Sequence, residues 1–137
     1  MPYRITDHTA DLGITVQAGS VESLFKEAAR AVSELIVGRR AFKSAEEIRI
    51  SVSGKDWPDL MVNWLREVLY LWNGKNLVPG PVDILRMEQF ALEAVVSVDS
   101  TPCNPHDVLA EIKAVTYHGI SVEKQASDWQ ARILFDI

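Results

Sequence analysis

The closing stretch WQARILFDI (Trp129–Ile137) shows the pattern that most constrains the fold. Side chains alternate between the two faces of a β-strand, so residues two apart share a face. One face of this stretch is entirely apolar, with Trp129, Ala131, Ile133 and Phe135. The other face includes Leu134, which makes the stretch apolar enough for the interior of a sheet. We therefore predict that the chain ends in a central strand, which would hold its last residues in place.

Apolar residues recur at helical spacing in two regions upstream of this strand. The first region begins after Ser20, a natural N-cap, and Gly38 can close it. Asp56 can cap the second region, which tolerates Pro58 in its first turn and ends at Gly74. The second region has the wider apolar stripe, so we expect its helix to be the more buried one. Tryptophans on such a stripe are more typical of a core than of a ligand pocket.

The remaining segments have the alternation or the composition of strands and turns. Strands are expected at residues 3–8, 13–18, 48–52, 83–88, 90–99, 110–119 and 120–124. LVPGPV (residues 77–82) and TPCNPH (residues 101–106) are expected to be loops or turns. Helices early and strands late predict an α+β fold: two layers, a mostly antiparallel or mixed β-sheet with two α-helices packed on one face. A parallel pair stays open, because one helix follows each of two strand regions.

Length and charge limit the classes of function. At 137 residues the chain is predicted to be a single domain, residues 1–137. Its net charge of -5 argues against direct, sequence-specific binding of nucleic acid, because phosphate neutralisation needs clustered Lys and Arg. The longest mostly apolar stretch, residues 60–72, is too short and too charged to span a membrane. The single cysteine, Cys103, and an N-terminus without a signal-peptide pattern predict a reducing, cytoplasmic location.

The second informative stretch is DHTADLGI (Asp7–Ile14) near the N-terminus. Asp11 lies at the junction of two expected strands, and the final strand places Asp136 beside the terminal oxygens of Ile137. Two carboxylates about 4 Å apart repel by roughly 4 kcal/mol at an effective dielectric near 20, and a hard divalent cation turns this repulsion into coordination. On spacing alone, however, a local Asx-turn or cap explains DHTAD better than a metal site does.

Four stretches, in the right order, resemble the archease family. They are DHTADLGI (7–14), LFKEAARAV (24–32), EIKAVTYHGI (111–120) and WQARILFDI (129–137). The resemblance covers nearly the whole chain, although residues 42–103 carry less of the family signature. Archeases are small cytosolic accessory proteins of the RtcB-type RNA ligase, which acts in tRNA splicing. The resemblance implies a non-catalytic activator that promotes guanylylation of the ligase histidine, sustains multiple turnover and broadens NTP use.

The resemblance also implies a metal site made of Asp11, Asp136 and the main chain of Ile137. Ca²⁺ is the expected metal because it accepts carboxylate, carbonyl and water oxygens with loose geometry; Mg²⁺, Mn²⁺ and Zn²⁺ stay open. Further candidates for a place beside the metal or at the partner contact are Asp7, His8, Lys113 and Tyr117. We favour the interpretation that His8 fixes the turn by hydrogen bonding. For Lys113 and Tyr117 we favour packing on the surface of the sheet.

Two other functions stay open from the residues themselves. One is a metal-dependent hydrolase that uses Asp11 and Asp136, and the other is a chaperone-like protein-interaction module with a structural metal. Cys103 and His106 would form a nucleophilic pair only if the fold brought them within hydrogen-bond reach of an orienting group. His118 precedes Gly119 and is expected to be a turn residue.

Overall fold

The computed structural model describes residues 3–7, 11–38, 42–43, 46–100 and 107–137, which form an α+β fold. In chain order the elements are β1 (Tyr3–Asp7), β2 (Asp11–Ala18), α1 (Val21–Val37), β3 (Glu46–Ser53), α2 (Trp57–Asn73), β4 (Val78–Glu88), β5 (Ala91–Asp99), β6 (Ala114–Gln125) and β7 (Asp128–Asp136). The predicted class and both predicted helices are confirmed. None of the described helices is both long enough and apolar enough to cross a bilayer.

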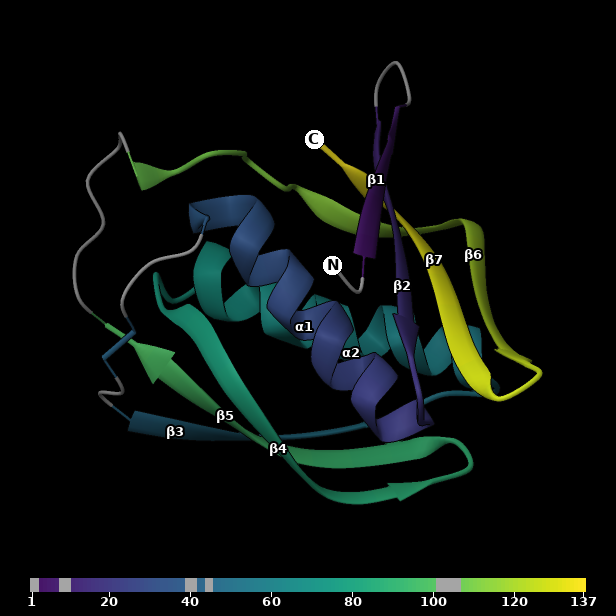
Figure 1. The fold of residues 1–137 in the computed structure, drawn as a ribbon. Helices are drawn as coiled ribbons and strands as arrows, with labels where there is room; N and C mark the ends of the chain where they lie inside the picture. The colour runs from purple at the N-terminus through teal and green to yellow at the C-terminus, as the bar shows by residue number, and fades with distance from the viewer. Residues whose placement is uncertain (1–2, 8–10, 39–41, 44–45, 101–106) are drawn as a thin grey trace.

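The strands divide between two sheets, whereas the sequence led us to expect one (Figure 1). The first sheet has the order β1-β2-β7-β6 and the second the order β3-β5-β4. Every pairing among the described strands is antiparallel, so the parallel pair left open by the sequence does not occur there. Apolar alternation identifies the buried face of a strand but not its partner strands, and it therefore could not separate two sheets from one. The final strand, β7, lies between β2 and β6, which confirms its predicted central place.

Both helices begin at the predicted caps. The Ser20 hydroxyl accepts a hydrogen bond from the Ser23 amide at 3.2 Å, and the Asp56 carboxylate accepts one from the Asp59 amide at 2.8 Å. Each cap satisfies a backbone N–H that has no partner within its helix. At the end of α1, Gly38 adopts φ +68°, a conformation that glycine tolerates without steric cost. Side-chain chemistry at the caps therefore sets both helix starts.

The core lies where the helices meet the sheets. Helix α1 contacts β2, β4 and β7, and α2 contacts β3, β4, β5 and β6, so each helix packs against both sheets (Figure 1). Trp64 of α2 is fully buried, and its indole N–H donates a 3.0 Å hydrogen bond to the Phe25 carbonyl of α1. This tryptophan is therefore a core residue, as its position on the apolar stripe predicted. Fully buried Phe135 extends the same core to the end of β7.

Two segments differ from the sequence-based expectation. Residues 78–82 were expected in a loop, but they open β4, with Pro79 paired to Val98. The register shifts between Pro79 and Val82, and β4 is an edge strand, where a residue without an N–H is tolerated. The two strands expected at 110–119 and 120–124 form one strand, β6, whose register shifts between Thr116 and Ser121. The turn expected at 101–106 lies outside the described residues.

Candidate metal centre

The antiparallel register places Asp11 directly opposite Asp136. These two acids come from opposite ends of the sequence, and β2 and β7 bring them together as neighbours in one sheet. Residues directly opposite each other on antiparallel strands have Cβ atoms about 4.5–5.5 Å apart. The proximity that the sequence analysis expected is therefore a property of this fold. The role of the two acids as metal ligands stays a prediction.

The end of β7 is held on both sides. Asp136 pairs with Asp11 of β2 and with Ala114 of β6, and its carbonyl accepts a 2.8 Å hydrogen bond from the Lys113 amide. Figure 1 shows the C-terminus beside the end of β2 that carries Asp11. A strand with neighbours on both edges has little freedom to fray, so this end of the chain presents its oxygens in a defined place.

Strand alternation separates the acids from the core. Phe135, next to Asp136, is fully buried against the helices, so Asp136 projects from the opposite, outer face of the sheet, where it is exposed. Asp11 belongs to the same outer face and is partly buried. The two acids therefore occupy facing register positions on the outer face of the sheet, which an ion or a partner protein can reach.

The donor set suits a hard cation. Asp11 and Asp136 contribute carboxylates, and the main chain of Ile137, which is 49% exposed, adds oxygens beside them. The residues that the structure describes contain no cluster of three or more His, Cys, Asp or Glu side chains able to hold a metal ion. A cation at this place would complete its six to eight oxygens from main chain, water or a partner. The same oxygen donors do not match the nitrogen and sulfur ligands that Zn²⁺ prefers.

Some of the other predicted residues are described by the structure, and some are not. Lys113 lies beside the acids through the bond from its amide to Asp136. Asp7 pairs with Leu12, the neighbour of Asp11, so strand alternation puts its register position on the opposite face of the sheet from Asp11. His8 lies outside the described residues, as do Cys103 and His106.

Tyr117 is engaged elsewhere. Its hydroxyl donates a 2.9 Å hydrogen bond to Asp59 of α2, and the guanidinium carbon of Arg66 lies 4.9 Å from the centre of its ring. The hydrogen bond to Asp59 raises the pKa of Tyr117 above its ordinary value. The Lys55 amide, and next the Tyr117 hydroxyl, lower the pKa of Asp59. These contacts attach the irregular part of β6 to α2. Tyr117 therefore has a structural role, whether or not it also contacts a partner protein.

Three residues that share a hollow with Asp11 were not predicted as site residues from the sequence. Thr15, His118 and Arg132 line a hollow of about 220 Å³ that Asp11 also lines. His118 was expected in a turn but lies within β6, where the strand register shifts. Register would have identified Arg132: once Asp11 is opposite Asp136, antiparallel pairing places Thr15 opposite Arg132.

The chain is similar to a well-defined set of proteins. The family model described as the Archease protein family (MTH1598/TM1083) matches residues 3–137. A relative named "Protein archease" from Methanosarcina mazei is 31% identical over 139 residues, covering 98% of this chain and 95% of the relative. A second of that name, from Pyrococcus furiosus, is 32% identical over 136 residues, covering 96% and 95%. The solution structure of Methanobacterium thermoautotrophicum protein 1598 matches the fold with a TM-score of 0.83 and 24% identity, covering 99% of both chains.

Proposed function

This chain belongs to the archease family, and on that premise we propose that it is an accessory activator of an RtcB-type RNA ligase. The proposed activity is to promote guanylylation of the ligase histidine, to sustain multiple turnover and to broaden the use of NTPs in tRNA splicing. The protein itself is not the catalyst in this proposal, and its proposed setting is the cytoplasm. The observation that carries the proposal is the pairing of Asp11 with Asp136 at the exposed end of a central strand.

The proposed metal ligands are Asp11, Asp136 and the main chain of Ile137. Their oxygens fit Ca²⁺ best among the divalent cations, with Mg²⁺ and Mn²⁺ as further candidates. When bound, such a cation supplies positive charge at an otherwise acidic end of the sheet. The chain's own residues hold the two carboxylates in register, and the Lys113 amide fixes the Asp136 peptide between its neighbours.

Activation requires a difference in binding. An accessory protein accelerates a step only if it interacts more strongly with the reacting state of the ligase than with the resting state. We propose that the end of the sheet with Asp11 and Asp136 docks beside the nucleotide site of the ligase and favours the state in which the histidine attacks GTP. The exposure of Asp136 and Ile137 supports this, because neither residue is covered by the rest of the described protein.

The decisive experiment is ligase guanylylation with and without this protein. We expect the wild type to accelerate formation of the ligase–guanylate adduct and Asp136→Asn to lose the acceleration. Asp128→Asn is the matched control, because Asp128 is an exposed acid at the opposite end of the same strand. Equal stimulation by wild type and Asp136→Asn would contradict the proposed site. Turnover of an RNA or nucleotide substrate without ligase would instead indicate a hydrolase, and rescue of unrelated clients would indicate a chaperone.

A further inference from the structure

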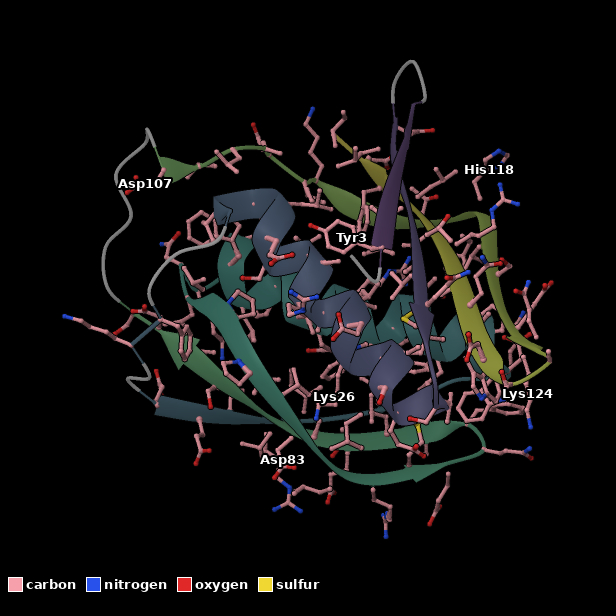
Figure 2. The ribbon with its side chains drawn as sticks, viewed as in Figure 1. Tyr3, Lys26, Asp83, Asp107, His118 and Lys124 are labelled. Carbon is pink, nitrogen blue, oxygen red and sulfur yellow. The ribbon has the colours of Figure 1, made fainter. Side chains whose placement is uncertain are left out.

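The hollow that Asp11 lines contains further polar side chains that could bind a ligand. It measures about 220 Å³ and opens on the outer face of the four-stranded sheet, between β2, β6 and β7. Figure 2 shows His118 on this outer side, away from the helices. The polar side chains that line it are Asp11, Thr15, His118 and Arg132, and Gly13 and Gly119 let backbone approach its interior. A small polar hollow with these donors is a candidate binding site.

Arg132 is the strongest donor in the hollow. Two other arginines form short ion pairs: Arg30 pairs with Glu27 and Glu34, and Arg49 pairs with Glu93 at 2.6 Å. Within the described part of the chain, by contrast, Arg132 forms no ion pair, and its strand neighbours are Thr15 and Ser121. An arginine guanidinium presents a planar set of N–H donors that matches the oxygens of a phosphate.

Two further donors face the same space. The Thr15 residue is only 8% exposed, and its hydroxyl can donate one hydrogen bond. His118 is exposed, and the structure holds its backbone by a 3.1 Å bond from the His118 amide to the Thr116 hydroxyl. This bond uses only the backbone amide, and His118 is among the residues that line the hollow. The adjacent contact of Tyr117 with Asp59 anchors this part of β6 to α2.

We propose that Arg132, Thr15 and His118 form a phosphate subsite beside the paired acids, which takes a free phosphate or the terminal phosphate of a nucleotide. The size supports a phosphate group without base or ribose, because pockets for drug-sized ligands measure about 300–1,000 Å³. The net charge of -5 disfavours a long polynucleotide as the ligand.

Asp11 makes phosphate binding depend on a cation. Its carboxylate lines the same hollow and repels phosphate until a cation held with Asp136 neutralises it. The two ligands therefore strengthen each other's binding by the same factor. This linkage rests on the metal site of the proposed function, whereas the direct contacts of Arg132, Thr15 and His118 do not.

The test is a titration of the ¹⁵N-labelled full chain with inorganic phosphate, with Mg²⁺ or with EDTA. We expect saturable shifts of the Gly13 and Gly119 amide resonances, and a Kd about tenfold higher in EDTA. Arg132→Gln should raise the Kd in Mg²⁺ by about tenfold or more, the usual scale for loss of a charged hydrogen bond. His118→Gln should raise it about threefold.

The matched control is Lys124→Gln, which removes a cation from the same strand as His118 at the other end of the sheet (Figure 2). It should leave the Kd unchanged. Absence of saturable shifts, or equal losses in Arg132→Gln and Lys124→Gln, would overturn the subsite. ATP should compete with phosphate and adenosine should not; competition by adenosine would overturn the assignment to a phosphate group.

Failure of this proposal is separable from failure of the proposed function. Asp136→Asn should remove the Mg²⁺ dependence of phosphate binding while leaving the weak binding that we expect in EDTA. Full Mg²⁺ dependence in that variant would overturn the linkage. Phosphate binding that persists in a protein without effect on ligase guanylylation supports the subsite and contradicts only the ligase proposal.

Discussion

The outer faces of the two sheets differ in how their charged side chains are paired across strands. On the three-stranded sheet, Arg49 of β3 bonds Glu93 of β5 at 2.6 Å, and Ser51 adds a bond to the same carboxylate. On the four-stranded sheet, Asp11 faces a second acid, Asp136, across the strand pair. Cross-strand pairs of opposite charge stabilise a sheet, and like charges directly opposite destabilise it. The charge pair on the first face stabilises its sheet. The like charges on the second face destabilise theirs, and a bound cation would offset that repulsion.

The largest effect is expected from removal of one of the paired acids. Asp136→Ala should weaken binding of Ca²⁺ by at least about tenfold and abolish ligase activation, because half of the carboxylate pair is lost. The metal-free variant should unfold at the same temperature as the wild type or higher, because like-charge repulsion is relieved. Calorimetric titration and thermal unfolding in EDTA measure the two effects. A large loss of metal-free stability would show that Asp136 is a structural residue.

A lysine at position 11 would give the four-stranded sheet a cross-strand pair of opposite charge, like that of the three-stranded sheet. Asp11→Lys would place a cation opposite Asp136, and we expect the metal-free free energy of unfolding to rise by up to about 1 kcal/mol. Cation binding should be lost in the same variant. Denaturant unfolding in EDTA tests the gain, with Asp11→Asn as the control that removes charge without adding a pair. A variant that still bound Ca²⁺ like the wild type would place the site elsewhere.

On the three-stranded sheet the corresponding change should affect stability alone. Arg49→Gln removes the hydrogen bond that lowers the pKa of Glu93, and we expect only a small loss of stability because the Arg49 side chain is solvent-exposed. A lowered folded-state pKa contributes stability above the unfolded pKa, near 4.3, which is lost as pH falls through the folded value. The wild type and the variant should therefore differ near neutral pH and converge in acid. Metal binding should be unchanged; a weakened Ca²⁺ affinity would contradict the separation of the two faces.

The smallest expected effect concerns the link between β6 and α2. Tyr117→Phe deletes the bond to Asp59, and we expect only a small loss of stability because Tyr117 is exposed. Asp59 raises the pKa of Tyr117, so this contribution is present below the unfolded value, near 10, and is lost as pH rises through the folded value. Stability curves of wild type and variant should converge at alkaline pH. A difference that persists unchanged above the folded pKa would show that the hydroxyl bond is not its source.

Much of this protein can be predicted from local pattern. Helical spacing and the Ser20 and Asp56 side chains located both helices, because capping depends on residues within one turn. Alternation located β7 and its buried face, and the motif match at both chain ends singled out Asp11 and Asp136. Proline chemistry misled the prediction at Pro79, because its cost depends on whether the strand lies at an edge.

Local sequence pattern was therefore sufficient for both helices with their caps, for most of the strands and, through the motif match, for the family and the two acids. Tertiary structure alone decided that the strands form two sheets, and that β7 pairs with β2 in the register that sets Asp11 against Asp136. The same register brought Arg132 to Thr15 and, with the irregular part of β6, created the hollow that contains His118. Alternation of apolar and polar residues in the sequence indicates only which face of a strand is buried. The partner and the register depend on contacts between residues far apart in the chain.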